Sequence, residues 1–154
     1  MSIITLTSDW GLDSHYAGAV KGKILNYNKN ITIIDITHNI NAFDILKASF
    51  IIRNSYKTFP EKTIHLIAVN SEASIETPHV VVEYDNHYFI SADNGIFNLI
   101  INNKPPDKIV ELTIHQDSDY FTFPERDIFA KAACFIASIK DSEEPSLLQT
   151  YTLL

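Results

Sequence analysis

Short apolar runs alternate along most of the chain with segments whose apolar residues recur every three or four positions. Runs that are β-branched and closed by turn residues predict strands. They lie at residues 3–6, 31–36, 64–69, 80–84, 87–91 and 108–112. The three-and-four spacing predicts helices. It occurs at residues 16–27, 44–56 and 127–139, and in a shorter stretch at 96–101.

The order of these segments predicts an α/β fold with a mostly parallel central sheet and helices on both faces, because right-handed crossovers place them there. Asp44 is suited to cap the second helix, and Pro60 ends that region. Asp85-Asn86 is a turn pair typical of a hairpin, which predicts an antiparallel addition to the sheet. We expect one α/β domain over residues 1–140 and a tail over 141–154.

Composition narrows the class of protein. The 154 residues are 45% hydrophobic and 20% charged, which is ordinary for one globular domain. A net charge of −7 without clustered Lys or Arg argues against a nucleic-acid partner. No leader-like start and no apolar stretch near membrane-spanning length is visible, so we expect no membrane partner and a cytoplasmic location. The single Cys134 lies among apolar residues and predicts a buried thiol.

The loops that follow the predicted strands are rich in Asp, Asn and Ser. Such groups recognise hydroxyls and amines and therefore favour a neutral or cationic ligand. The six histidines show no two-ligand spacing and the chain has four glycines, so neither a metal site nor a phosphate-binding loop is predicted. His65 lies inside a strand pattern and is expected in the core. A Ser-His-Asp nucleophile stays open, although no Gly-x-Ser-x-Gly elbow is present.

Asp9 is the most informative of these polar residues. It follows the first strand, at the edge of an open α/β sheet where small ligands bind and where a carboxylate can hold ribose hydroxyls. The alternative is that Asp9 caps a helix that begins near Asp13 or Ser14.

Seven short motifs, taken together, resemble the S-adenosyl-L-methionine (SAM) hydroxide adenosyltransferases, the family that also contains the SAM-dependent chlorinase and fluorinase. In chain order they are Thr7-Ser8-Asp9-Trp10-Gly11, Gly18-Ala19-Val20-Lys21-Gly22, Asp35-Ile36-Thr37-His38, Ala42-Phe43-Asp44, Phe59-Pro60, Ala92-Asp93-Asn94-Gly95 and Arg126-Asp127-Ile128-Phe129-Ala130. Each motif is weak alone, but their shared order over residues 7–130 makes the resemblance specific.

The resemblance implies an N-terminal domain that binds SAM or adenosine, with SAM as substrate and no separate cofactor or metal. It further implies a β-rich C-terminal domain, which we expect to be absent here, and a homotrimer with the site between subunits. Asp9 matches the ribose ligand, and Phe43 an aromatic position against the ligand or, alternatively, a core contact. The other implied ligand residues are Trp10, Ser71, Asp93 and Asn94, of which the last two also suit a Gly-terminated turn.

The implied reaction is attack of water on the ribose C5′ of SAM, which releases methionine and adenosine. The sequence departs from the family where an Asp, an Arg and a His are thought to activate that water. Asn70 stands at the Asp position, the Arg position falls near Thr77, and Pro124 stands at the His position. Glu125 follows and would repel a halide, so halogenation is disfavoured.

Three residues of the replaced loop and its border are the remaining catalytic candidates. Asn70 cannot act as a base, but Glu72 and His79 could form a different acid-base pair. The alternatives are a solvated loop charge for Glu72 and an exposed strand-end residue for His79. We therefore expect a divergent SAM hydrolase domain, with a noncatalytic adenosine- or SAM-binding module or a truncated remnant of the family as alternatives.

Overall fold

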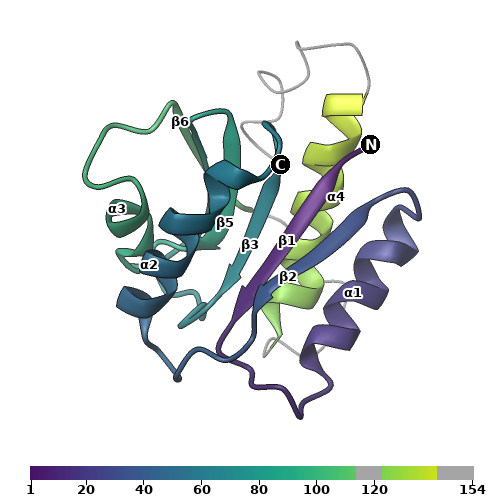
Figure 1. The fold of residues 1–154 in the computed structure, drawn as a ribbon, viewed down its shortest axis with the longest axis horizontal. Coiled ribbons are helices and arrows are strands. Elements are labelled where there is room, and N and C mark those ends of the chain that lie inside the picture. The colour runs from purple at the N-terminus through teal and green to yellow at the C-terminus, as the bar shows by residue number, and fades with distance from the viewer. Residues whose placement is uncertain (114–122, 142–154) are drawn as a thin grey trace.

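A six-stranded sheet forms the centre of the molecule (Figure 1), in a computed structural model that describes residues 1–113 and 123–141. The strands are β1 (Ile3–Ser8), β2 (Thr32–Thr37), β3 (Ile64–Ala68), β4 (His79–Tyr84), β5 (His87–Ala92) and β6 (Lys108–Glu111). Their order across the sheet is β2-β1-β3-β5-β4-β6. The β2, β1, β3 and β5 strands are parallel neighbours, whereas β4 pairs antiparallel with both β5 and β6.

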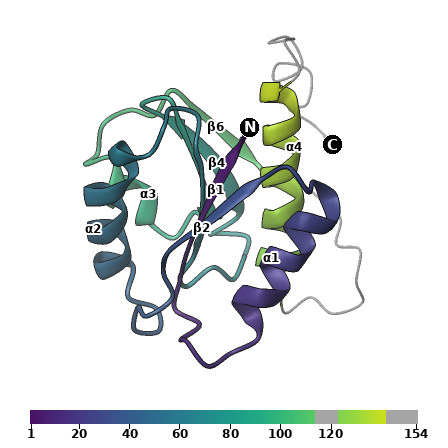
Figure 2. The ribbon, with the colours of Figure 1, turned by 45° about the vertical axis from the view of Figure 1, so that its right-hand side comes forward.

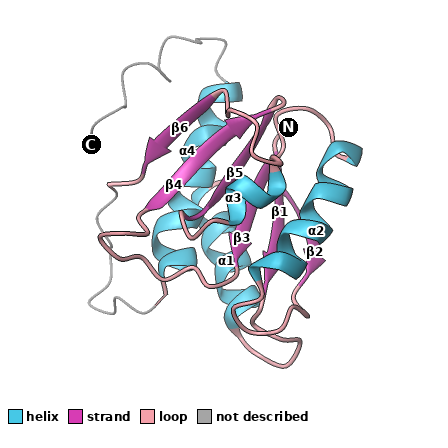
Figure 3. Ribbon diagram, turned by 90° about the vertical axis from the view of Figure 1, so that its left-hand side faces the viewer, coloured by secondary structure: helices cyan, strands magenta, loops and turns pink. Residues whose placement is uncertain are grey.

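Helices cover both faces of this sheet (Figure 2). They are α1 (Tyr16–Tyr27), α2 (Ile45–Ser55), α3 (Ile96–Ile100) and α4 (Ala130–Asp141), with a 3-10 turn η1 (Tyr56–Thr58) after α2 and a π-helical segment η2 (Glu125–Phe129) leading into α4. The α1 and α4 helices pack on one face, and α2 and α3 on the other (Figure 3). No helix in the two described ranges is long and apolar enough to cross a membrane.

Each face has its own apolar core, because side chains alternate across a strand. On the α1 and α4 side, Ile4 and Leu6 of β1 pack with Val20 and Ile24 of α1 and with Phe129. The other core lies under α2 and α3 and is built by a second set: Ala48, Ile52, Ile67, Val69, Val82, Phe89, Ile96 and Phe97. The predicted α/β class, with helices on both faces, is confirmed.

The local sequence signals also hold in detail. The Asp44 side chain accepts a hydrogen bond from Lys47 N at 2.9 Å and caps α2 as predicted. Asp85 and Asn86 have φ of 52° and 58°, the left-handed pair that a two-residue hairpin turn requires. Cys134 is buried. The last helical region begins earlier than predicted, with a π-helical turn at Glu125 that follows Pro124. The predicted tail lies outside the described residues beyond Asp141.

Two histidines join the strands near the amino ends of β3 and β5. His65 is 1% exposed, as expected for a core residue, and its Nδ1 lies 2.7 Å from Thr5 Oγ1. Its Nε2 lies 3.2 Å from Nδ1 of His87, which is also buried. Burial, with a smaller contribution from His87, lowers the pKa of His65 to about 3. Burial also lowers the pKa of His87. Both rings are therefore neutral in the folded protein near pH 7.

Because these pKa values lie below the unfolded value of about 6.5, the unfolded chain binds more protons than the folded one. The stability that the neutral pair contributes is complete above about pH 6.5 and is lost as the pH falls below it. We expect the free energy of unfolding to decrease between pH 7 and pH 5, with His65 contributing up to about 1.4 kcal/mol per pH unit. Urea unfolding at both pH values measures this. His65→Gln should flatten the dependence, and an unchanged slope in that variant contradicts the assignment.

Candidate functional site

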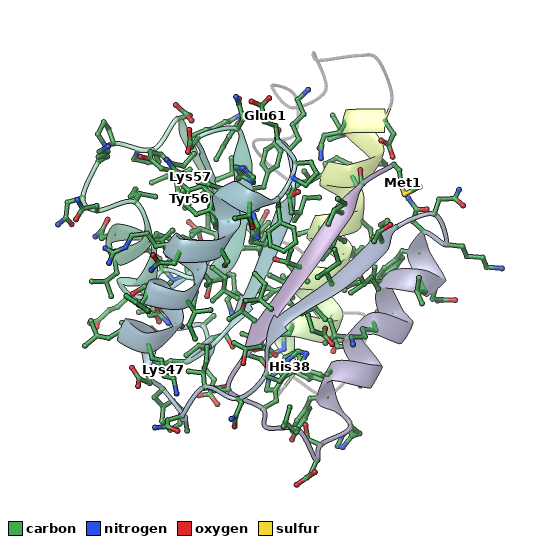
Figure 4. The ribbon with its side chains drawn as sticks, in the orientation of Figure 1. Met1, His38, Lys47, Tyr56, Lys57 and Glu61 are labelled. Carbon is green, nitrogen blue, oxygen red and sulfur yellow. The ribbon has the colours of Figure 1, made fainter. Side chains whose placement is uncertain are left out.

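The predicted site residues lie at the carboxyl edge of the parallel strands. Figure 4 shows His38, which follows β2, at this edge, and Met1 and Glu61, which precede β1 and β3, at the opposite end. The loops that meet here follow β1, β2, β3 and β5. They bring residues 9–10, 38–44, 70–71 and 93–94 to the same side of the sheet.

Asp9 connects three of these loops. Its Oδ2 accepts hydrogen bonds from the backbone amides of Phe43 at 3.0 Å and Asn70 at 3.4 Å. Among the described residues Oδ1 has no hydrogen-bond partner, so it can accept from a ligand hydroxyl. The alternative role as a helix cap is wrong, because α1 begins only at Tyr16, after His15, and its N-terminus has no side-chain cap.

Phe43 is held in an unusual backbone conformation beside Asp9. Its φ is 65°, which is rare for a bulky residue and costs about 1–3 kcal/mol. The side chain is 70% exposed, so the alternative of a core contact is wrong. Asn70 also has a left-handed φ, of 48°. Asp9 thus anchors two strained backbone positions, a pattern that concentrates at ligand sites.

Trp10 belongs to an aromatic cluster that sequence reasoning did not assemble. Its ring stacks on His38, with centroids 5.7 Å apart, and meets Phe123 edge-on at 5.9 Å. A hydrogen bond of 2.6 Å between Nδ1 and Ser8 Oγ fixes the His38 ring, and its Nε2 lies 3.1 Å from Asp35 Oδ1 without a hydrogen bond of good geometry.

Ser8, His38 and Asp35 therefore form the Ser-His-Asp contact that the sequence left open. Ser8 is fully buried, however, and a serine nucleophile must reach its substrate. This set of contacts orients the His38 ring beneath Trp10. The motifs that contain Ser8 and His38 were visible in the sequence, but their contact across two strand ends was not.

The turn after β5 supports the loop after β3. Asn94 Nδ2 donates to the carbonyls of Asn70 at 2.7 Å and Val69 at 3.2 Å, and its Oδ1 accepts from Ile96 N at 3.2 Å. Asp93 is exposed, and its amide donates to Pro78 O at 2.8 Å. Asn94 thus has a clear structural role, whereas the Asp93 carboxylate faces solvent beside it.

Ser71, His79 and Glu125 form a buried cluster behind this loop. Ser71 Oγ donates to Glu125 Oε1, and His79 Nε2 donates to Ser71 O at 2.7 Å. His79 is 6% exposed, so the alternative of an exposed strand-end residue is wrong. Glu72 is exposed, and no hydrogen bond or ion pair joins it to His79 within the described parts of the chain.

Charge and burial set the pKa values of this cluster. Burial, above all, raises the pKa of Glu125, and the nearby charges of Asp9 and Glu72 raise it further, against the hydrogen bond from Ser71. Burial lowers the pKa of His79. Within residues 1–113 and 123–141, no three His, Cys, Asp or Glu side chains gather as a metal-binding group.

Comparison with known proteins gives consistent matches. A family model described as the SAM hydroxide adenosyltransferase N-terminal domain matches residues 4–145. The (R)-S-adenosyl-L-methionine hydrolase of Methanocaldococcus jannaschii is 32% identical over 84% of this chain and 51% of its own length. The protein of the same name from Thermus thermophilus is 23% identical over 89% of this chain and 57% of its own. The chain thus spans about half the length of the curated relatives it matches.

Two solved structures share the fold. A crystal structure of an uncharacterized conserved protein from Thermotoga maritima superposes with a TM-score of 0.80 at 32% identity, over 88% of this chain and 53% of that one. A conserved hypothetical protein from Thermus thermophilus superposes with a TM-score of 0.73 at 25% identity, over 90% and 54% of the respective chains.

Proposed function

Since the chain belongs to the family of SAM hydroxide adenosyltransferase N-terminal domains, we propose that it binds SAM and hydrolyses it to adenosine and methionine. The observation that carries the proposal is the Asp9 carboxylate. One of its oxygens is occupied by two backbone amides, and the other is open at the edge of the sheet where α/β proteins bind ligands.

The ribose hydroxyls of SAM would donate to Asp9 Oδ1. Trp10, next to Asp9 in the chain, and Phe43, whose amide binds Asp9, supply aromatic surface for the adenosine. The exposed Phe43 ring has no core role that competes with this. Ser71, Asp93 and Asn94 complete the proposed ligand set. Because SAM carries a sulfonium charge, the acidic edge formed by Asp9, Glu72 and Glu125 favours its binding.

The reaction needs water aligned behind C5′ and a low-dielectric site around it. Methionine is a good leaving group, so alignment supplies much of the rate enhancement. Asn70, Glu72 and His79 stay our catalytic candidates from the sequence. Asn70 can orient a water through its amide, and His79 holds the Ser71 carbonyl. SAM enters as substrate, and no separate cofactor or metal is part of the proposal.

Incubating the purified chain with SAM tests this function. We expect adenosine and methionine to form in equal amounts, measured by liquid chromatography. In a calorimetric titration, we expect SAM to give a heat of binding that saturates. Binding of SAM or adenosine without products would favour a noncatalytic binding module, the reading that Asn70 and Pro124 at the family's catalytic positions also favour. Neither binding nor products would overturn the proposal.

We also propose that the chain assembles as a homotrimer that places the site beside a second subunit. Phe43, Leu46 and Phe50 lie on one side of the α2 region and are 70%, 67% and 61% exposed. Large exposed apolar side chains that follow one another along a short segment favour an interaction site. Phe43 lies next to Asp9, which supports an interface at the site. Sedimentation velocity gives the mass of the purified chain in solution, and a mass other than that of a trimer contradicts the proposal.

A further inference from the structure

Glu125 is a buried carboxylate at the proposed site, and the reaction proposed above gives it no catalytic role. It is 7% exposed and is the first residue of the π-helical segment η2, directly after Pro124. A carboxylate is rarely buried this deeply unless it is paired or functional. Single π-helical turns within α-helices are frequent at functional sites, because the extra residue displaces a side chain from the regular helical path.

The contacts of Glu125 connect it to the loop that follows β3 at the ligand edge. Leu6, Trp10, Val20 and Leu66 line a narrow, mostly apolar crevice together with Glu125. Ser71 Oγ donates to Oε1 from the loop that follows β3. His79 in turn holds the Ser71 carbonyl. Ser71 therefore holds the Glu125 carboxylate, and His79 holds the backbone of Ser71 in turn.

The charges that act on Glu125 from the neighbouring loops are of its own sign. Asp9 from the end of β1 and Glu72 from the loop after β3 both raise its pKa, and burial is the largest cause. Arg126, the adjacent cation, donates to Asp127 at 2.8 and 2.9 Å. Burial and these like charges raise the pKa of Glu125 and so make it a stronger proton acceptor than a glutamate in solvent.

We propose that Glu125 is the general base of the SAM hydrolysis, an inference that rests on the function proposed above. The water oxygen attacks C5′ while the C5′–S bond breaks, and the bonding pair leaves with sulfur as the neutral thioether of methionine. The proton of the water passes to a Glu125 oxygen and from there to solvent. SAM and water thus yield adenosine, methionine and one proton, without any further reactant.

Two comparisons within the site favour Glu125 over the loop candidates. Glu72 is exposed, so it lacks both the burial that strengthens a base and a fixed direction. Asn70 has no titratable group. Among these candidates within the described ranges, Glu125 alone is an acid that is both buried and held by a hydroxyl from a neighbouring element.

The test compares the full chain with Glu125→Gln and with Glu61→Gln as a matched control. Glu61 is exposed at the opposite end of the sheet (Figure 4), and its replacement makes the same change in net charge. For each protein, calorimetry gives the Kd for SAM, chromatography gives the turnover, and thermal melting reports the fold. Glu125→Gln should fold as well as the wild type, because it removes a buried charge.

We expect Glu125→Gln to bind SAM within about threefold of the wild type and to lose turnover by about 100-fold or more, the usual contribution of a general base. Glu61→Gln should keep both. Wild-type turnover should rise with pH through an apparent pKa above the ordinary glutamate value. Ser71→Ala should move that rise to higher pH, since the lost hydroxyl lowers the pKa of Glu125. A purely structural Glu125 would not produce this shift.

Four results overturn the inference, and the first two of them leave the proposed function in place. Turnover of Glu125→Gln within about tenfold of the wild type removes Glu125 as the base while leaving hydrolysis in place. A pH profile that Ser71→Ala does not move has the same consequence. Binding of SAM by the wild type without products rejects the base and leaves a binding module. Absence of both binding and products rejects the proposed function itself, and the inference with it.

Discussion

Replacing Asp9 by Asn is expected to weaken binding of SAM and of adenosine by about 10- to 100-fold. A hydrogen bond to a charged group contributes about 1.5–3 kcal/mol, and each 1.4 kcal/mol is about tenfold in Kd. In the variant, the one remaining side-chain oxygen is needed by the amides of Phe43 and Asn70, which now bind Oδ2. The amide nitrogen would then face the ribose with a donor where the carboxylate offered an acceptor.

Calorimetric titration of both ligands measures this effect. Because adenosine lacks the methionine part, an equal loss for SAM and adenosine locates the contact on the nucleoside. Glu61→Gln serves again as the control at the far end of the sheet and should bind like the wild type. If Asp9→Asn bound both ligands with unchanged Kd, Asp9 would be a loop anchor only, and the observation that carries the proposed function would be lost.

Replacing Phe89 by Ala is expected to lower the free energy of unfolding by about 3–5 kcal/mol, the usual cost of removing a buried phenylalanine. Phe89 lies in β5 and is fully buried. Its ring stacks on His65 with centroids 5.0 Å apart and meets Tyr56 edge-on at 5.4 Å. The variant would leave a cavity in the core beneath α2, where the strands paired on both sides of β5 limit collapse.

Chemical denaturation gives the difference in unfolding free energy directly. Leu12→Ala is a suitable comparison, because Leu12 is 76% exposed and its loss should change stability by no more than about 0.5 kcal/mol. A loss below about 1 kcal/mol in Phe89→Ala would mean that this core is not packed as described.

Most of the fold could be predicted because its signals are local. The Asp44 cap, the Asp85-Asn86 turn and the apolar strand runs each depend on residues within one element and its border. The wrong alternative for Asp9, a helix cap, has the same origin. An aspartate a few residues before a helix has a local explanation as a cap, whereas its actual partners, the amides of Phe43 and Asn70, are 34 and 61 positions away.

The candidate site could be predicted only in part, since its geometry depends on distant contacts. The contact between Ser71 and Glu125 spans 54 positions, and the one between Ser8 and His38 spans 30. The periodicity of apolar residues along the sequence does not indicate which distant residues contact each other. A buried glutamate is likewise indistinguishable from a solvated one in a sequence. The only sequence signal for Glu125 was its place beside Pro124, where the resemblance implies a His. That signal indicated a departure from the family's catalytic residues, but it did not indicate that Glu125 is buried.

The buried histidine pair and the proposed ligand site lie at opposite ends of the sheet. The buried pair of His65 and His87 lies toward the amino ends of the strands, and Asp9 and Glu125 lie at the carboxyl edge. Substitutions at one end therefore have few shared partners with those at the other, and their free energies should add. For protein engineering, this means that stabilising substitutions around His65 can be combined with a library of variants at the carboxyl edge that is screened for ligand binding.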